Sequence, residues 1–417
     1  MIKIHNLTPN TFHHRYFLTQ CESTTLSDYC WLLGIPFSFD EDSYLCEVEL
    51  PKGYDNKLNF KDIDWSFLAK NKSKKLILTH RIIYSLSDYI DELNDIIIKY
   101  DLKDRVFWLS MNPLDFKHKD NINFKLLFLD SLVHVIFEWS VYYFFYCFKY
   151  QDKINVTNNY NIPISDNRFN LPYPINEIKR HERLNFKKCS KYFFSASKMQ
   201  KAHRLLATYL IYNNIKSSES IITQHGIEVL PQDVNSYVYA FADRLDHFNI
   251  DINELIKFKD FRGGSFGNES IPEENVTTDI VSTTSKAFQE AFKSCLVQYV
   301  HESTSNEVEI YISEKTWANY LFGRPFIING NKGSLYYLNK YYGFKSFGDI
   351  FDESYDLMDN YVDRVYYGVE QLQKFCSLDF DEARRRVESL ENVYEHNFKV
   401  LTSLDFHKIF MRTFDDI

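Results

Sequence analysis

Four consecutive residues, Ser313-Glu314-Lys315-Thr316, have types and a spacing that can hold a negatively charged ligand. They lie where a polar loop is predicted to open a helix. The start of a helix presents free N–H groups and the positive end of its dipole, and a lysine there adds a full charge, so phosphate can be bound without a metal. Glu314 can accept hydrogen bonds from paired sugar hydroxyls. The same residues also fit a plain helix start, in which Ser313 caps the helix and Glu314 complements the dipole.

An alternation of strands and helices is predicted to position these groups. In the first half, residues 74–80 and 105–112 have strand patterns, and residues 85–102 between them have helical spacing. This β-α-β order implies a parallel sheet with helices on its faces. Active groups in such sheets lie just past the carboxyl ends of the strands.

A second α/β unit follows a break in the pattern. The polar stretch 150–188 contains Pro163, Pro172 and Pro174 and predicts a domain boundary. After it, the predicted elements are a strand at 191–197, a helix at 198–214, strands at 219–226 and 295–304, a strand, helix and strand within 308–331, and a helical tail whose clearest amphipathic stretch is 381–401. We therefore predict three parts: an N-terminal acceptor-side α/β domain at 1–175, a Rossmann-like nucleotide-sugar-binding domain at 186–365, and C-terminal helices at 366–417 that pack back across the domains.

Charge and cysteine content limit the classes of partner and compartment. The chain has 417 residues with 48 basic and 57 acidic side chains, a net charge of −9. A DNA-binding surface would therefore have to be a local basic patch, for which the candidates are Lys179, Arg180, Arg183, Arg384, Arg385 and Arg386. The seven cysteines are scattered without a C-x-x-C pair, and with no leader-like start the chain is expected in a reducing cytoplasm.

One apolar stretch, residues 126–148, imitates a membrane helix. It contains Asp130, His134 and Glu138, which are costly in hydrocarbon. We expect a buried strand, or a strand followed by a helix, and no membrane span. Burial in this apolar stretch would raise the pKa of Glu138 and make it a candidate general base.

The order of motifs in the second unit resembles the donor-binding half of GT-B glycosyltransferases, in particular the α-fucosyltransferase-like families and related phage-encoded enzymes. The matching residues are Glu302 after a strand, Ser313-Glu314-Lys315, Gly323-Arg324-Pro325-Phe326-Ile327, Gly330, and Gly343-Phe344-Lys345-Ser346-Phe347. Upstream, Lys198, His203 and Arg204 match the basic positions of the segment that opens that domain, and Ser195 or Ala196 stands where Asn is usual. The resemblance covers about residues 188–363.

The resemblance implies an α/β fold in which two Rossmann-like domains face a cleft, and a hexosyl- or pentosyltransferase that needs no metal and takes a nucleotide-diphosphate sugar as co-substrate. Lys315 and Arg204, with Lys198, would stabilise the charge that develops on the leaving diphosphate. Glu314 would hold donor hydroxyls, and Asn329 and Gly330 would lie near the base or ribose. His203, Glu302 and Ser313 complete the predicted donor site, and Glu138 would supply the base from the opposite domain.

The acceptor is open from the sequence. The first choice is a hydroxymethylated pyrimidine in phage DNA, because of the phage-like resemblance and a residue usage rich in A/T-coded amino acids. A cell-surface glycan or lipopolysaccharide precursor is the second, since an acidic chain has no handicap there. A non-catalytic phage protein on a degenerate transferase fold is a third, because of the missing Asn near Ser195.

Overall fold

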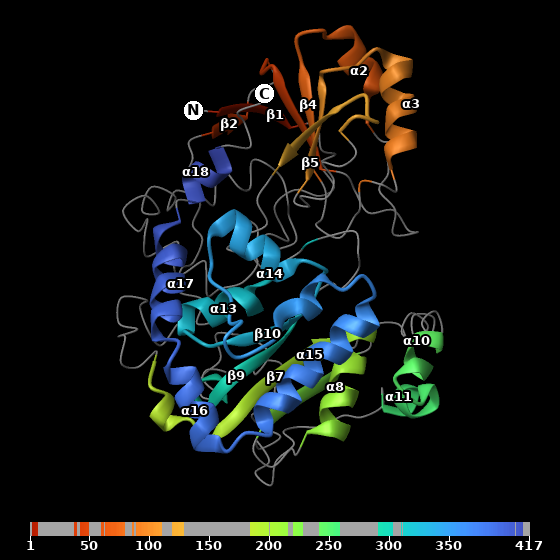
Figure 1. Cartoon of the computed structure of the whole chain (residues 1–417). Coiled ribbons are helices and arrows are strands. Elements are labelled where there is room, and N and C mark those ends of the chain that lie inside the picture. The colour runs from red at the N-terminus through yellow and green to blue at the C-terminus, as the bar shows by residue number, and fades with distance from the viewer. Residues whose placement is uncertain are drawn as a thin grey trace. The chain divides into compact units, whose positions relative to one another are not determined.

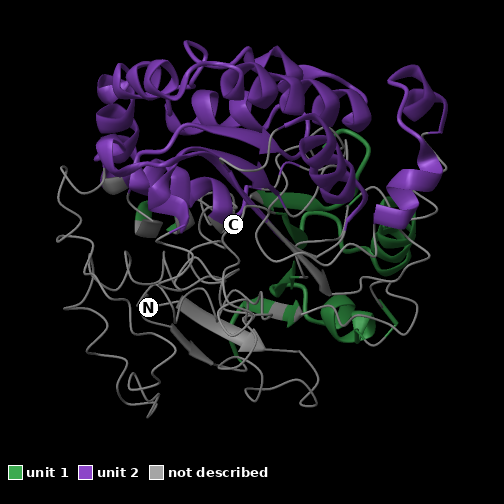
Figure 2. Ribbon diagram, turned by 90° about the horizontal axis from the view of Figure 1, so that it is seen from below, with its two compact units in different colours: residues 1–169, 405–417 green, residues 170–404 purple. Residues whose placement is uncertain are grey.

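The computed structural model describes residues 2–6, 37–39, 42–49, 60–61, 63–79, 86, 89–110, 119–128, 184–199, 201–215, 220–227, 242–258, 291–302, 310, 312–404 and 406–411. It is a mixed α/β structure with two separate sheets in which every strand pairing is parallel (Figure 1). The chain divides into two compact units (Figure 2). Unit 1 is Met1–Phe169 with Asp405–Ile417, and unit 2 is Asn170–Leu404. The residues predicted as a separate C-terminal part thus divide between the two units.

Unit 1 contains a sheet of strand order β2-β1-β3-β4-β5-β6. Its strands are β1 (Ile2–Asn6), β2 (Phe37–Phe39), β3 (Leu45–Glu49), β4 (Lys75–Thr79), β5 (Val106–Ser110) and β6 (Lys125–Phe128), and its helices are α2 (Trp65–Lys70), α3 (Ile90–Tyr100) and α18 (Phe406–Met411). Helix α2 joins β3 to β4 and α3 joins β4 to β5. The predicted strands at 74–80 and 105–112 and the helix between them correspond to β4, β5 and α3.

The core of unit 1 explains why these segments form strands and helices. The side chains of β4 and β5 are almost all buried, because a parallel strand is covered on both faces. Leu93 and Ile97 lie four residues apart on α3 and place one face of the helix against this core. Asp64 caps α2 by accepting from the amide of Phe67 at 3.0 Å.

Unit 2 contains a sheet of order β10-β9-β7-β8. The strands are β7 (Lys191–Met199), β8 (Ile221–Ile227), β9 (Cys295–His301) and β10 (Phe326–Asn329). The helical segments are η7 (Phe186–Lys188), α8 (Ala202–Asn214), α10 (Ala242–His247), α11 (Ile252–Phe258), α13 (Glu314–Phe322), α14 (Ser334–Tyr337), η11 (Leu338–Tyr342), η12 (Glu353–Leu357), α15 (Tyr361–Cys376), α16 (Phe380–Glu388) and α17 (Glu391–Ser403).

The strand order places the two crossover helices of unit 2 on opposite faces of its sheet. The chain runs from β7 through α8 to β8 in one direction, and from β9 through α13 to β10 in the other. Since β-α-β crossovers are right-handed, opposite directions put α8 and α13 on opposite faces. The contacts agree: α15 packs on α8, and α17 packs on α13 (Figure 1).

Three segments of unit 2 have boundaries that differ from the patterns read in the sequence. The helix predicted from residue 198 begins at Ala202, because β7 continues to Met199 by pairing with β8. The amphipathic stretch at 381–401 is two helices, since α16 ends at Glu388 and α17 begins at Glu391. The predicted strand at 295–304 is β9, and it ends at His301.

A buried acid, Asp356, holds the segment after β10. Its carboxylate accepts from the amides of Leu335 at 3.0 Å and Tyr336 at 3.4 Å, and its carbonyl accepts from the amide of Gly333. Burial raises the pKa of Asp356 to about 7, with Glu353 acting in the same direction and Arg364 and the two amides acting against it. The start of α14 is therefore held by a carboxyl group that titrates near neutral pH.

We expect Asp356→Asn to remove a loss of stability at high pH. The folded pKa of about 7 lies above the ordinary 3.8, so the contribution of this group is fully present below about pH 4 and is lost as pH rises through 7. At roughly 1.4 kcal/mol per pKa unit, the variant should be the more stable protein by up to about 4 kcal/mol at pH 8 and similar to wild type at pH 4. Urea unfolding at both pH values measures this, and parallel pH profiles of the two proteins would contradict it.

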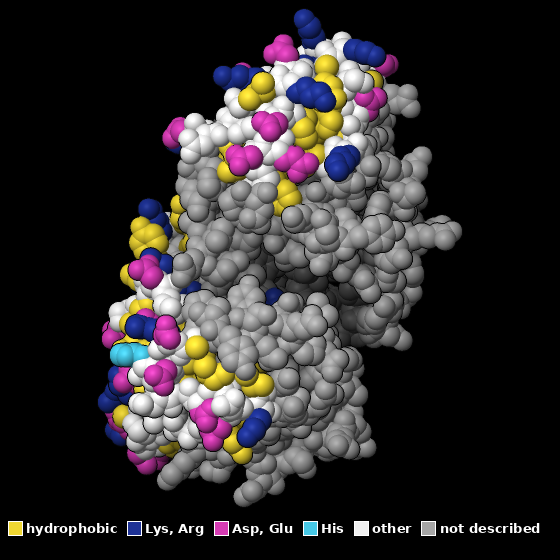
Figure 3. All heavy atoms as spheres, turned by 90° about the vertical axis from the view of Figure 1, so that its right-hand side faces the viewer, with side chains coloured by type: hydrophobic (Ala, Val, Ile, Leu, Met, Phe, Trp, Pro, Cys, Tyr) yellow, Lys and Arg dark blue, Asp and Glu magenta, His cyan; other side chains and the backbone are white. Residues whose placement is uncertain are grey.

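Two surface properties follow from the described residues. None of the described helices has the length and apolar character needed to cross a membrane. On the face shown in Figure 3, described acidic and basic side chains are interspersed.

Candidate functional site

The carboxyl ends of β7 and β9 form the switch point of the unit 2 sheet, because the chain leaves these neighbouring strands in opposite directions. Ligands of open α/β sheets bind in the crevice outside such a point. The chain enters α8 from β7 and reaches α13 from β9, so the first turns of both helices follow this edge. Most of the residues predicted to bind a donor lie here.

Glu302, directly after β9, is fully buried, and its backbone carbonyl is held by two side chains of α8. Arg204 donates to it from Nε at 3.0 Å and from Nη2 at 2.7 Å, and His203 Nε2 lies 3.1 Å from the same oxygen. A carbonyl only accepts, so His203 carries its proton on Nε2. Arg204 is only 4% exposed, which places its guanidinium inside the protein rather than on an open surface.

The carboxylate of Glu302 occupies the first turn of α13. Both of its oxygens accept from the amide of Ser313 at 3.1 Å, and Oε1 also accepts from the hydroxyl of Thr316 at 2.5 Å. Ser313 and Thr316 are themselves fully buried. The Glu302 carboxylate therefore accepts from the amide at the start of α13, a group that the sequence predicted to bind a ligand.

A second buried network contains Ser195, His301 and Asn329, a trio that resembles a nucleophile, base and orienting group. Asn329 Nδ2 donates to the carbonyl of His203 at 3.1 Å, which fixes the orientation of the amide. The same nitrogen lies 3.2 Å from His301 Nδ1, so Nδ1 accepts and Nε2 donates to the Ser195 hydroxyl at 2.8 Å. His301 thus donates a hydrogen bond to the Ser195 hydroxyl through Nε2, so this nitrogen cannot accept the proton of that hydroxyl. The trio is therefore not a nucleophilic triad.

The two buried histidines are neutral. Burial, followed by the charges of Arg204 and Lys315, lowers the pKa of His301 to about 3. Burial and the adjacent Arg204 lower the pKa of His203 well below its usual range, against the opposing effect of the bond to the Glu302 carbonyl. Among the described side chains named here, Arg204 and Lys315 are basic and Glu302 is acidic, so the basic groups outnumber the acidic ones by one.

Lys315 is the partly exposed member of the cluster. Its amide and its Nζ both lie 3.4 Å from the Ser313 hydroxyl, so the side chain folds back over the cap of α13. Lys198 lies in β7 and Glu314 is the first residue of α13, but the side chains of both are outside the described part of the structure. Glu138, the predicted base, also lies outside the described residues.

Gly330 is placed against Glu302. A Cβ at this position would lie 3.1 Å from both Cβ and Cγ of Glu302. The amide of Glu302 donates to the carbonyl of Asn329 at 2.9 Å, which adds a backbone contact between the two segments. The turn after β10 is therefore part of the same cluster.

The Gly343-Phe344-Lys345-Ser346-Phe347 motif serves packing. Phe344 stacks on Tyr320 of α13 with ring centroids 4.1 Å apart, and Phe347 packs edge-on against Phe326 of β10. Asn397 of α17 accepts from the amide of Lys345 at 2.7 Å and donates to its carbonyl at 2.9 Å. The motif thus packs on α13 and β10 and connects them to α17.

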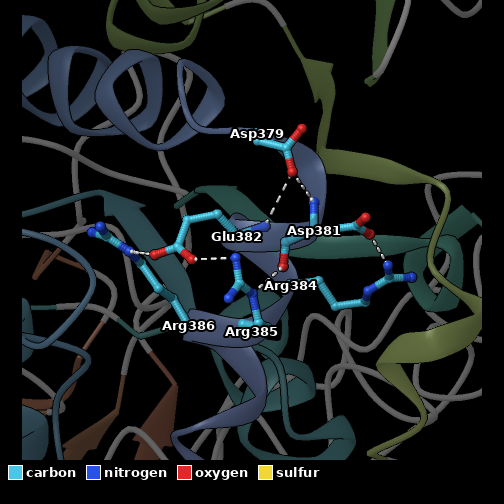
Figure 4. A network of polar contacts seen from close by, with 6 residues as sticks. All are labelled: Asp379, Asp381, Glu382, Arg384, Arg385 and Arg386. Atoms are coloured by element: carbon cyan, nitrogen blue, oxygen red, sulfur yellow. Dashed lines mark hydrogen bonds and ion pairs between the residues drawn. The ribbon is translucent and has the colours of Figure 1, made fainter.

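The predicted DNA-binding arginines of α16 are paired with acids on their own helix (Figure 4). Arg384 pairs with Asp381, while Arg385 and Arg386 each contact Glu382 at 2.9 Å. Lys179, Arg180 and Arg183 lie outside the described residues.

Sequence reasoning missed two members of the site. Thr316 was quoted within the motif without a role, and His301 was read only as a strand residue. The available signal was position: His301 ends β9 next to Glu302, and Thr316 is one residue beyond the lysine on α13.

In comparisons with known proteins, no family model, curated protein or solved structure matches the chain. Within the described residues, no group of three or more His, Cys, Asp or Glu side chains is arranged to hold a metal ion. The class that the structure defines is an α/β protein with two parallel sheets.

Proposed function

We propose that the protein is a glycosyltransferase that binds a nucleotide-diphosphate sugar at the carboxyl edge of β7 and β9. The proposal is supported by what lies at the topological switch point of the unit 2 sheet. Buried polar groups gather there with more basic than acidic side chains, and Lys315 is partly exposed beside them. The resemblance of the motif order to GT-B donor domains agrees with this placement.

The chemistry proposed for the site is stabilisation of a leaving group. As the bond between sugar and diphosphate breaks, negative charge grows on the diphosphate, and the ammonium group of Lys315 is proposed to balance it. Arg204 is proposed to stabilise the same negative charge through the electric field of its buried guanidinium. This guanidinium also donates to the backbone carbonyl of Glu302. Glu314 is proposed to hold donor hydroxyls, and Glu138 stays the predicted base that removes the acceptor proton.

For the acceptor, we favour a glycan hydroxyl over hydroxymethylated DNA. A DNA acceptor needs excess positive charge to neutralise phosphates. The segment 379–388 has four acids (Asp379, Asp381, Glu382 and Glu388) against three arginines, so its charge is 3 − 4 = −1. Transfer to hydroxymethylated DNA that falls steeply with salt would reverse this choice.

We expect Lys315→Ala to weaken the binding of nucleoside diphosphates at least tenfold. Removal of a charge-assisted contact costs about 1.5–3 kcal/mol, and about 1.4 kcal/mol corresponds to tenfold in Kd. Titration calorimetry of the full chain with uridine, guanosine and cytidine diphosphates measures this. Lys374→Ala is the matched control, because Lys374 is 61% exposed on α15 and pairs with Glu370; it should bind as wild type. Equal affinities of the Lys315 variant and wild type would refute the proposed donor site.

A further inference from the structure

Thr316 lies too deep to touch a ligand, and its hydroxyl donates a hydrogen bond to another residue of the protein. The side chain is fully buried, and Oγ1 donates to Glu302 Oε1 at 2.5 Å. The amide of Ser313 donates to the same carboxylate. Thr316 and Ser313 therefore hold one carboxylate between them at the start of α13.

Glu302 joins three segments of the chain. Through its backbone, Glu302 is fixed to Arg204 and His203 of α8, and through its side chain to α13. Its Cβ and Cγ border Gly330 in the turn after β10. The carboxylate thus contacts the start of α13 while the backbone of the same residue contacts α8.

Lys315 lies between the two residues that hold this carboxylate. The Ser313 hydroxyl accepts from the Lys315 amide, and Lys315 Nζ lies 3.4 Å from the same oxygen. Any loosening of Ser313 moves the oxygen against which the lysine side chain folds. Thr316 and the Lys315 ammonium are therefore connected through the Glu302 carboxylate and Ser313.

We infer that Thr316 is a positioning residue for the diphosphate-binding lysine, acting through the side chain of Glu302. The inference rests on the proposed function for the identity of the ligand only. Thr316→Val keeps the shape of the side chain and removes the donor, whereas Thr316→Ser keeps the donor and removes a methyl group. The two variants separate a hydrogen-bond effect from a packing effect.

The first measurement needs no ligand. Hydrogen exchange at the Ser313 amide reports its bond to the Glu302 carboxylate. Thr316→Val should speed this exchange at least tenfold, and Thr316→Ser should restore it to within about threefold of wild type. Unchanged exchange at Ser313 in Thr316→Val would overturn the inference whether or not any nucleotide binds.

The second measurement uses inorganic pyrophosphate and uridine and guanosine diphosphates as probes, by calorimetry on the full chain. Thr316→Val should weaken binding about tenfold, Thr316→Ser should recover it, and Thr316→Val should have no added effect in Lys315→Ala, because both changes act on one group. An additive loss in the double variant would overturn the inference. Wild type that binds none of the probes would refute the proposed function instead, and the exchange result would still decide the role of Thr316.

Discussion

Glu302→Ala is expected to destabilise the start of α13 by about 2–6 kcal/mol, since two buried donors lose their partner and each costs about 1–3 kcal/mol when left unsatisfied. The donors are the Ser313 amide and the Thr316 hydroxyl. The backbone carbonyl that Arg204 and His203 contact is kept in the variant, so the change isolates the carboxylate. Hydrogen exchange of the α13 amides, measured on the full chain, gives the free energy of local opening.

Glu302→Gln is the matched control for this change. The side-chain oxygen of glutamine can still accept a hydrogen bond. Its NH₂ group can donate to the Thr316 hydroxyl, but it cannot accept from the Ser313 amide because both groups are donors. The expected order of stability is therefore wild type, then Glu302→Gln, then Glu302→Ala. Nucleoside diphosphate binding should follow the same order. An alanine variant with wild-type exchange in α13 would show that the carboxylate does not hold the helix.

Phe344→Ala is expected to cost about 3–5 kcal/mol, the range for removing a buried aromatic side chain. Phe344 is 1% exposed and packs against Trp317, Tyr320 and Tyr342. The loss should appear as faster exchange in α13 and β10 and as a lower melting temperature. The affinity for nucleoside diphosphate should fall only in proportion to the fraction of molecules in which α13 is locally unfolded.

Tyr341→Ala is the control for Phe344→Ala, because it removes an aromatic ring of the same segment that is 60% exposed. Surface substitutions of this kind usually change stability by less than about 0.5 kcal/mol. If Phe344→Ala were as stable as Tyr341→Ala but lost ligand binding, the motif would contact the ligand, and the packing role would be wrong.

The strands and helices of the described residues were largely predictable because burial imposes a period on the sequence. The apolar runs of β4, β5 and β9 and the helical spacing of α3 are examples. The start of α8 was misplaced because residues 195–199 alternate small, polar and apolar types that suit either structure. Only the pairing of Ser195–Ser197 and Met199 with β8 decides for a strand.

The sequence indicated which residues gather at the site but not how they contact one another. Arg204 and Glu302 were read as ligand-binding groups because their motifs resemble the donor-binding half of GT-B glycosyltransferases. In the structure Arg204 instead donates to a backbone carbonyl, and the Glu302 carboxylate accepts from a helix start. Arg204 and Glu302 are 98 positions apart, and Glu302 and Ser313 are 11 apart on different elements, so no local pattern reveals either contact.

The central claim is that a nucleotide-sugar binds at the carboxyl edge of β7 and β9, and hydrogen exchange of the full chain with and without saturating nucleoside diphosphate tests it most directly. The account predicts that binding slows exchange at residues 199–204, 312–316 and 329–331, which surround Glu302. Slowing confined to unit 1, or to the helices α16 and α17, would contradict it.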